Sequence, residues 1–272
     1  MMKALLTIYR SLPWFKGKLR LGKLLFSNYV NASHEFTFNA HDGVTYTIPN
    51  TLENIGLELI INGVYEKEVL DFLKANMKDH SVFFDVGANV GSIGIPVAKT
   101  KKAIDYHCFE AAPDTFDYLQ KNIESNHLTS FQSSNCLVHH TSGISHRFYV
   151  SALHGKNSLA PTYSNDYIEV GAVTIDDYCR MNEIPQIDWM KVDVQGFELF
   201  VFQGAKALLQ NQLVKNILFE NEPWAEDQAG IERGKAQQFL LDCGYSLFDM
   251  QGHVWNNQIE TRETMIWAKC VG

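Results

Sequence analysis

The sequence predicts an α/β protein built on a mostly parallel, doubly wound β-sheet. From about residue 65, short apolar runs alternate with segments of helical periodicity. The last two apolar runs, at 245–250 and 264–268, have no helical segment between them, and Gly252 supplies a turn, so they predict a closing antiparallel pair. A sheet of this kind is covered by helices on both faces and binds ligands at the carboxyl ends of its strands.

Each remaining apolar run predicts one strand. We expect these strands at 81–86, 104–109, 131–138, 187–192 and 217–220. Helices are expected between them; Pro113 opens one, because its fixed φ suits a first helical turn, and Gly244 ends another. Residues 139–173 break the alternation and predict an insertion near the mouth of the ligand crevice.

Two segments precede the sheet. Residues 36–48 predict a β-hairpin outside the main fold, with its turn at Asp42-Gly43. Residues 1–34 carry six basic side chains, no acidic ones and many apolar ones. This arm is too often interrupted by charge to span a membrane, and it lacks the apolar core of a secretory signal. It predicts helices that pack on the body or form an oligomer contact, or that lie on a membrane surface. We expect residues 1–50 to form this arm and hairpin, and residues 51–272 to form the domain that holds the sheet.

The charge balance limits the classes of partner. The whole chain has a net charge of −8, and residues 35–272 hold 17 Lys and Arg side chains against all 31 Asp and Glu, a net charge of −14. An acidic body argues against nucleic-acid binding, which needs a positive surface. The five cysteines form no CxxC pair, so neither a zinc site nor a disulfide framework is predicted. A reducing, cytoplasmic setting is expected, with peripheral attachment to the inner face of a membrane as the further possibility that the arm raises.

The first chemical motif is DVGANVG at 85–91, directly after a predicted strand. Gly87 and Gly91 let the backbone approach a ligand closely. A dinucleotide site would have G-x-G-x-x-G, but Asn89 stands at its middle glycine. Asp85 would repel a pyrophosphate, and is placed either to attract the ammonium of an amino-acid-bearing cofactor or to pair with another cation. A tight turn without a ligand is the alternative.

Glu110 ends the second predicted strand, 23 residues after Gly87. A carboxylate at this point is positioned to accept both hydroxyls of a ribose, as in nucleotide-binding sheets generally. An exposed glutamate at a strand end is the alternative. Asn135 and Cys136, in the third predicted strand, are candidates to flank the base of the cofactor, and ordinary strand packing explains them equally well.

The second chemical motif is KVDVQGFE at 191–198. Asp193 falls at the carboxyl end of the fourth strand, where the reactive group of a cofactor is expected. A carboxylate there can accept the proton that an alcohol loses during attack. Glu198 follows the turn at Gly196 and is either a substrate contact or a carboxylate favoured by the helix dipole.

The fifth strand ends in FENEPW at 219–224. Glu220, Glu222 and Trp224 are candidate substrate contacts because they follow the carboxyl end of a predicted strand; solvated loop charges are the alternative for the two glutamates. We expect Glu220 to orient the hydroxyl of the alcohol whose proton Asp193 accepts. No resident metal is expected, and a divalent cation held by Asp193 and Glu220 is the alternative.

These motifs resemble the FkbM family of S-adenosylmethionine-dependent methyltransferases. The resemblance covers about residues 56–225 and rests on five segments in family order, at 85–91, 110–113, 173–178, 191–198 and 218–220. Two positions depart from the family pattern. The family usually has E-P-x-P where this chain has EAAP at 110–113, and Glu where it has Gln195, which makes catalysis by residue 195 doubtful but leaves binding open.

The resemblance implies a seven-stranded sheet and methyl transfer from S-adenosylmethionine to a hydroxyl of a sugar, a glycan or glycolipid, or a secondary metabolite. The stretch 155–159 is similar to the Gly/Ser-rich loop of the family, so Ser158 becomes a candidate substrate contact, as does Gln195. His154, in the predicted insertion, is a further candidate, with a surface or packing residue as the alternative. Two alternatives stay open: a nicotinamide-dependent oxidoreductase, against which Asp85 and Asn89 speak, and a cofactor-binding module without catalysis, which Gln195 suggests.

Overall fold

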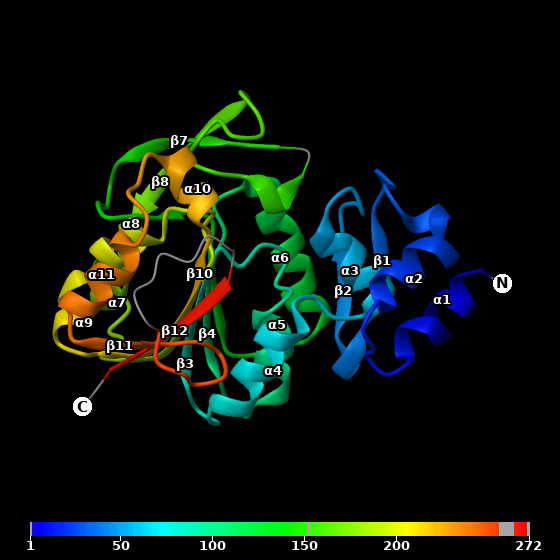
Figure 1. The fold of residues 1–272 in the computed structure, drawn as a ribbon, viewed down its shortest axis with the longest axis horizontal. Helices are drawn as coiled ribbons and strands as arrows, with labels where there is room; N and C mark the ends of the chain where they lie inside the picture. The colour runs from blue at the N-terminus through cyan, green and yellow to red at the C-terminus, as the bar shows by residue number, and fades with distance from the viewer. Residues whose placement is uncertain (1, 152, 256–263, 271–272) are drawn as a thin grey trace.

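A seven-stranded sheet forms the centre of the computed structural model, which describes residues 2–151, 153–255 and 264–270. Its strands, in chain order, are β3 (Val82–Val86), β4 (Asp105–Phe109), β5 (Phe131–Ser134), β9 (Ile187–Val192), β10 (Val214–Asn221), β11 (Tyr245–Phe248) and β12 (Thr264–Cys270). Their order across the sheet is β11-β12-β10-β9-β3-β4-β5 (Figure 1). Only β12 runs antiparallel to its neighbours β10 and β11, and the paired strands from β5 to β10 are parallel. The predicted doubly wound, mostly parallel sheet with an antiparallel last strand is therefore confirmed.

Helices cover both faces of this sheet. One face carries α4 (Lys67–Asn76), α5 (Gly94–Thr100) and α6 (Pro113–Ser125); the other carries α7 (Ile175–Met181), α8 (Glu198–Gly204), α9 (Lys206–Gln210) and α11 (Lys235–Asp242). Neighbouring strand residues point to opposite faces, so Phe83 joins the first apolar core and Phe84 the second, and both are fully buried. Burial on both faces explains why the strands read as continuous apolar runs.

The predicted strand at 131–138 is wrong in one respect, because two strands of different sheets occupy it. β5 ends at Ser134, and β6 (Leu137–Val138) belongs to a separate three-stranded sheet with β8 (Tyr167–Val173) and β7 (Ser145–Tyr149). Between β5 and β6 the side chain of Asn135 donates hydrogen bonds to the backbone oxygens of Glu110 and Ala111, at 2.9 and 3.1 Å. These bonds turn the chain away from the main sheet. The predicted insertion supplies β7, the turn η3 (His154–Lys156) and β8.

The N-terminal segment forms a helical layer that packs against the body. It comprises α1 (Met2–Ser11), α2 (Lys18–Leu25) and the short turn η1 (Ser27–Tyr29), and α1 and α2 both contact α3 (Asn54–Asn62). Two of its six basic residues are internal. Arg10 donates to the backbone oxygens of Ile60 and Asn39, both at 2.8 Å, and Lys18 donates to those of Arg10 and Leu12, at 2.9 and 2.6 Å. Arg10 therefore joins the layer to α3 and to β1 (Phe36–Asn39), and Lys18 joins α2 to the end of α1.

The predicted hairpin is confirmed as a separate two-stranded sheet of β1 (Phe36–Asn39) and β2 (Thr45–Ile48), with the turn η2 (His41–Gly43) between them. Two asparagines four residues apart, Asn122 on α6 and Asn126 just after its last residue, bind the edge of the hairpin. Asn122 accepts from the Thr47 N–H at 2.6 Å and donates to the Thr47 oxygen at 3.1 Å; Asn126 makes the same pair of bonds with Thr45, at 2.8 and 2.7 Å. Four residues of helix and two of strand each rise about 6 to 7 Å, so the two spacings match.

Asn122 also donates to the oxygen of Val90, at 2.9 Å, and is fully buried. We expect Asn122→Ala to lower the free energy of unfolding by about 2–4 kcal/mol, because it leaves buried backbone groups without partners. Urea denaturation measures this change. Asn76→Ala, at an exposed site at the end of α4, is the matched control and should change stability by less than about 0.5 kcal/mol. Equal unfolding curves for the two variants would show that this pairing does not hold the hairpin.

Candidate active site

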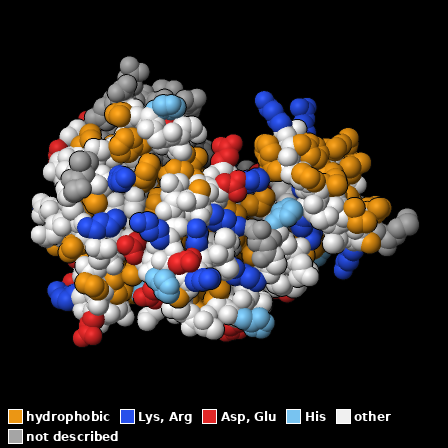
Figure 2. Space-filling model, turned by 90° about the horizontal axis from the view of Figure 1, so that it is seen from below, with side chains coloured by type: hydrophobic (Ala, Val, Ile, Leu, Met, Phe, Trp, Pro, Cys, Tyr) orange, Lys and Arg blue, Asp and Glu red, His pale blue; other side chains and the backbone are white. Residues whose placement is uncertain are grey.

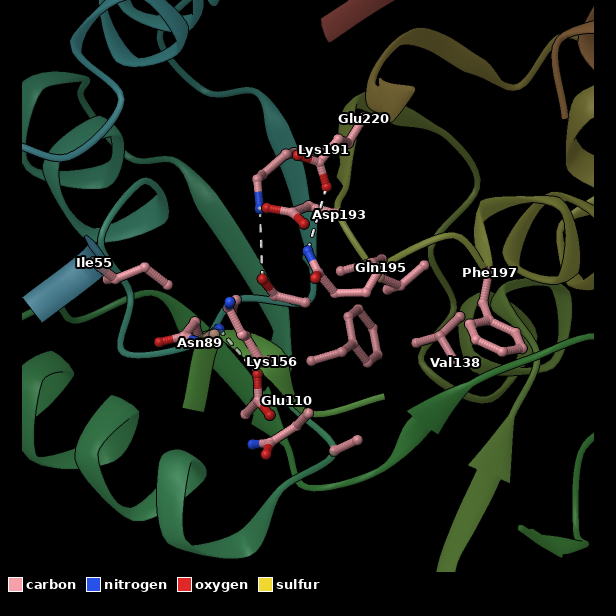
Figure 3. A pocket seen from close by; sticks show the side chains of 18 of the residues that line it. Ile55, Asn89, Glu110, Val138, Lys156, Lys191, Asp193, Gln195, Phe197 and Glu220 are labelled. Carbon is pink, nitrogen blue, oxygen red and sulfur yellow. Dashed lines mark hydrogen bonds and ion pairs between the residues drawn. The ribbon is translucent and has the colours of Figure 1, made fainter. Parts of the chain in front are cut away.

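A cleft of about 330 Å³ opens at the carboxyl ends of β3, β4, β9 and β10. The loop around η3 and the beginning of α3 contribute to its walls (Figure 3). Parallel strands bring their carboxyl ends to one edge of the sheet, which is why residues far apart in the sequence meet here. Eight of the predicted site residues line the cleft: Gly87, Asn89, Glu110, Cys136, Asp193, Gln195, Glu220 and Glu222.

The turns after β3 and β9 touch each other at Gly87. A Cβ atom on this glycine would lie 1.9 Å from the backbone oxygen of Asp193, and its φ of +77° is one that side chains disfavour. The turn after β3 continues through Asn89, whose φ of +50° is tolerated best by Asn among the residues other than glycine. Only glycine at position 87 therefore lets the two chemical motifs lie against each other.

Glu110 is fixed to the wall of the cleft by backbone groups. One carboxylate oxygen accepts from the N–H of Asn89 at 3.0 Å, and the other accepts from the N–H of Ala112 at 2.9 Å. Burial raises the pKa of Glu110 to about 7, although these two N–H groups act in the opposite direction. The carboxyl group thus has one orientation, with its side toward the cleft available to a ligand hydroxyl.

Lys191 lines the cleft as a buried cation between two carboxylates. The parallel register places Lys191 directly beside Asp85, and its Nζ atom is 3.5 Å from Asp85 Oδ1, 3.2 Å from Asp193 Oδ2 and 3.4 Å from the Gly87 oxygen. Burial alone would lower the pKa of Lys191, but Asp193, Asp85 and Glu66 outweigh it and raise this pKa above its ordinary value. Lys191 is therefore charged.

Asp85 does not line the cleft, so its position supports one of its two predicted roles and not the other. It is buried, pairs with Lys191 and accepts a hydrogen bond from the Tyr106 hydroxyl at 3.2 Å. It therefore acts as the partner of a protein cation, whereas the prediction that it attracts the ammonium of a cofactor has no support in its position. Asp85 compensates the charge of Lys191 inside the fold and so helps to position the residues of the cleft.

Asp193 and Glu220 form a coupled pair of carboxyl groups at the centre of the site. The register pairs Val192 with Phe219, so the next residues of the two strands stand at the same level. Burial opposes the ionisation of Asp193, but Lys191 and hydrogen bonds from Glu220 and Gln195 lower its pKa. Burial and the charge of Asp193 raise the pKa of Glu220 well above its usual range. These opposite shifts favour a state in which Asp193 is ionised and Glu220 holds the proton.

Gln195 extends this network from the turn after β9, and its Nε2 atom donates to Glu220 Oε2 at 3.4 Å (Figure 3). Gln195 itself has a φ of +56°. Glu198 holds this turn from behind, since its carboxylate accepts from the N–H groups of Val194 at 3.0 Å and Gly196 at 3.4 Å. Glu198 does not line the cleft, so its position makes it a support of the loop.

Four further predicted site residues lie outside the wall of the cleft: Gly91, Asn135, Ser158 and Trp224. Gly91 is in the turn before α5, and Asn135 binds backbone oxygens, as described above. Ser158 is buried and accepts from the Ala160 N–H at 3.3 Å. His154 begins η3, but its side chain falls outside the described part of the structure. Trp224, which is 47% exposed, contacts the ring of Tyr163 at a centroid distance of 5.8 Å, and Tyr163 does line the cleft.

Sequence patterns gave no signal for several residues that meet here. Glu53 accepts a hydrogen bond from the Gly155 N–H and so ties the η3 loop to the beginning of α3. Burial raises the pKa of Glu53 to about 7. Tyr65 lines the cleft, and burial followed by the charge of Asp193 raises the pKa of its neighbour Glu66 to about 7. These residues precede the first strand of the main sheet, in segments where polar residues at helix ends are common.

The wall of the cleft carries more acidic than basic groups. Among the residues that the structure describes, five acidic side chains and two lysines line it: Glu53, Glu110, Asp193, Glu220, Glu222, Lys156 and Lys191. Lys191 is already paired with two carboxylates. Such a wall suits a ligand with positive charge and hydroxyl groups and opposes a diphosphate. Within the same described ranges, no group of three or more His, Cys, Asp or Glu side chains is arranged to hold a metal ion.

Comparison with known proteins relates this chain to methyltransferases. The family model described as "Methyltransferase FkbM domain" matches residues 85–247. Methyltransferase sdnD of Sordaria araneosa is 24% identical over 227 residues, which cover 72% of this chain and 85% of that protein. Hexuronic acid methyltransferase AglP of Haloferax volcanii is 28% identical over 146 residues, 54% of this chain and 59% of that protein. A solved TehB-like SAM-dependent methyltransferase from Corynebacterium glutamicum aligns with a TM-score of 0.44 and 10% identity, covering 78% of this chain and 92% of that one.

Glu198 makes stability depend on pH. Burial raises its pKa from 4.5 to about 8, so the folded state holds this proton more tightly than the unfolded state. The stability that the proton contributes is complete below about pH 4.5 and is lost as the pH rises through about 8. We expect Glu198→Gln, which keeps a carbonyl acceptor without charge, to gain more than about 1 kcal/mol relative to the parent protein over this range.

Denaturant unfolding at several pH values tests this expectation. Glu124→Gln, on the exposed side of α6, is the matched control and should track the parent protein throughout. A constant difference between Glu198→Gln and the parent protein from pH 5 to about pH 8 would contradict the assignment.

Proposed function

This chain belongs to the FkbM methyltransferase family, and from that premise we propose that it methylates a hydroxyl oxygen of a sugar or glycan. The chain is a methyltransferase, and its cofactor is S-adenosylmethionine. The alternative of a nicotinamide-dependent oxidoreductase is therefore set aside. We choose oxygen as the methyl acceptor because of the Asp193–Glu220 pair. An alcohol needs a proton acceptor as it attacks, and this pair provides one.

The residues of the cleft fit the cofactor by their chemistry. When bound, S-adenosylmethionine supplies a methyl group on a positively charged sulfonium, already activated for displacement. We assign the ribose hydroxyls to Glu110, whose carboxylate has a fixed orientation. Phe109, Cys136, Leu137 and Val138 line the adjoining part of the cleft and offer an apolar wall to the base. The carboxylates around Asp193 favour the positive charge of the cofactor.

Asp193 takes the proton of the acceptor hydroxyl in this proposal. It is ionised because Lys191 stabilises its charge, and Glu220 supplies a protonated carboxyl beside it. The protonated Glu220 donates its one hydrogen bond to Asp193 and so holds the base in position, while Gln195 holds Glu220 in turn. Proton acceptance by a positioned group contributes about 10²- to 10⁴-fold to a rate. Fixed positioning of the acceptor beside the methyl group supplies the rest of the rate enhancement.

Aromatic and basic side chains near the mouth of the cleft support a sugar as the acceptor. Tyr163 and Trp224 form an aromatic pair that is partly open to solvent, and such rings stack on the apolar faces of sugars. The Lys156 ammonium lies 4.6 Å from the centre of the Tyr163 ring and also lines the cleft. Among the relatives, AglP is named as a hexuronic acid methyltransferase, so an acidic sugar is the first acceptor to test.

The proposed site for the ribose predicts a loss of cofactor binding. Hydrogen bonds to a charged group are each worth about 1.5–3 kcal/mol, so Glu110→Ala should weaken S-adenosylmethionine binding about 10- to 100-fold. Isothermal titration calorimetry measures the affinity, and circular dichroism checks that the variant is folded. Glu124→Ala, on an exposed face of α6, should bind as the parent protein does. Unchanged affinity in a folded Glu110→Ala protein would exclude this assignment.

Methyl transfer to a hydroxyl predicts an ether product. We expect label from methyl-labelled S-adenosylmethionine to enter a hexuronic acid acceptor in a bond that survives mild base, since an ether survives it and a methyl ester does not. Asp193→Asn should reduce the rate about 10²- to 10⁴-fold, and Glu220→Gln, which imitates the protonated state, should reduce it much less.

Each result has a distinct meaning for the proposal. Label that mild base releases would show that the carboxyl group is the acceptor and would overturn the choice of oxygen. Full activity of Asp193→Asn would overturn the choice of base. Cofactor binding without transfer to neutral or acidic sugars would favour the cofactor-binding module that Gln195 suggested.

A further inference from the structure

The N-terminal layer exposes a concentration of large apolar side chains. Of the fifteen exposed large hydrophobic side chains in the described ranges, nine lie between residues 2 and 25. We refer to these nine as the α1–α2 face: Met2, Leu5, Ile8, Leu12, Trp14, Phe15, Leu21, Leu24 and Leu25. Scattered apolar side chains are normal on a protein surface, but a contiguous group of this size marks an interaction site.

The exposed apolar residues of α1 and α2 recur at helical spacing. On α1, which packs on α3, the buried residues are Leu6, Tyr9 and Arg10. A second set recurs every three or four residues beside the first, from Met2 to Leu12, and it is 41 to 60% exposed. On α2 the same spacing relates Leu21 to Leu24 and Leu25, of which Leu24 is 77% exposed. Each helix therefore presents an apolar stripe that the fold itself does not use.

The connection between the two helices adds two exposed aromatic rings to this group. Trp14 is 52% exposed and Phe15 is 39% exposed, and both lie between the end of α1 and the beginning of α2. Figure 2 shows apolar side chains gathered at this end of the molecule, with basic side chains at the edge of the group. Aromatic rings at the boundary of an apolar patch are typical of helices that lie in a membrane interface.

Charge distinguishes this face from the rest of the molecule. Residues 1–34 contain no Asp or Glu, and after Arg10 and Lys18 are assigned to internal hydrogen bonds, Lys3, Lys16 and Arg20 remain exposed. Lys23, beside them on α2, is half-buried. The remainder of the chain has a net charge of −14. A positive rim around an apolar centre complements a surface that is anionic outside and apolar beneath.

We propose that the α1–α2 face binds the surface of a bilayer that contains anionic lipids. The apolar stripes and Trp14 enter the boundary between headgroups and acyl chains, and Lys3, Lys16 and Arg20 contact the anionic headgroups. A symmetric dimer through this face would place two basic arms against each other, which costs electrostatic free energy. No described helix is long and apolar enough to cross a membrane, so the binding is peripheral.

Vesicle sedimentation with the full chain tests the proposal. We expect the protein to partition onto vesicles of phosphatidylcholine mixed with phosphatidylglycerol, and much less onto phosphatidylcholine alone. The double variant Ile8→Gln, Leu24→Gln should lower the partition coefficient roughly tenfold or more, because two exposed apolar side chains no longer enter the bilayer. The triple variant Lys3→Gln, Lys16→Gln, Arg20→Gln should lower it similarly and remove its dependence on salt.

Matched controls replace exposed apolar and basic side chains elsewhere on the surface. Met181 and Val254 are 65 and 68% exposed, and Lys78, Lys102 and Lys206 are exposed lysines outside the arm. The double variant Met181→Gln, Val254→Gln and the triple Gln variant of these lysines should bind vesicles as the parent protein does. All variants should keep the same affinity for S-adenosylmethionine, which confirms that the cleft is intact.

Three outcomes would overturn the proposal. The first is equal binding of the parent protein and the double variant to the mixed vesicles. The second is equal binding of the parent protein to both kinds of vesicle, which would remove the role of the charges. The third is self-association without lipid, seen by sedimentation velocity and lost in the double variant, which would make the face a contact between copies of the chain.

Discussion

The buried ammonium of Lys191 is the interaction on which the rest of the site depends. It lies within 3.5 Å of Asp85 on the neighbouring strand and within 3.2 Å of Asp193 at the cleft. Asp193 keeps its charge beside a second carboxyl group because this cation compensates it, and the extra proton therefore lies on Glu220. Removing one member of a buried ion pair leaves the other uncompensated, which costs several kcal/mol. The same residue thus compensates buried charge within the sheet and favours the ionised form of Asp193 in the proposed catalytic pair.

The strands and both chemical motifs could be predicted because their signals are local. Apolar runs become strands, and the segments 85–91 and 191–198 each combine a strand end, a carboxylate and a turn that needs glycine. The segment 131–138 shows where this approach fails. Its apolar pattern does not reveal which sheet a strand joins, and the side-chain bonds of Asn135 divide it between two sheets.

The partners of the predicted residues could not be read from the sequence, because they depend on contacts between distant segments. Glu53 and Gly155 are 102 positions apart, and Lys191 and the Gly87 oxygen are 104 apart. Composition likewise marked Arg10 and Lys18 as members of a basic arm, although their hydrogen bonds are internal. Residue types at strand ends thus indicated the location of the cleft, while the charge state of each group followed only from the packed structure.

The paired bonds of Asn122 and Asn126 have a consequence beyond stability. Because they fix β2 to the carboxyl-terminal end of α6, and only two residues separate Glu110 from the beginning of α6, this helix connects the hairpin to the wall of the cleft. The helical layer shares an apolar core with this region, so it cannot tilt freely against the sheet. On a bilayer the cleft would then stand at a fixed height above the lipid, so the distance of a hydroxyl from the membrane would determine whether it reaches the cleft.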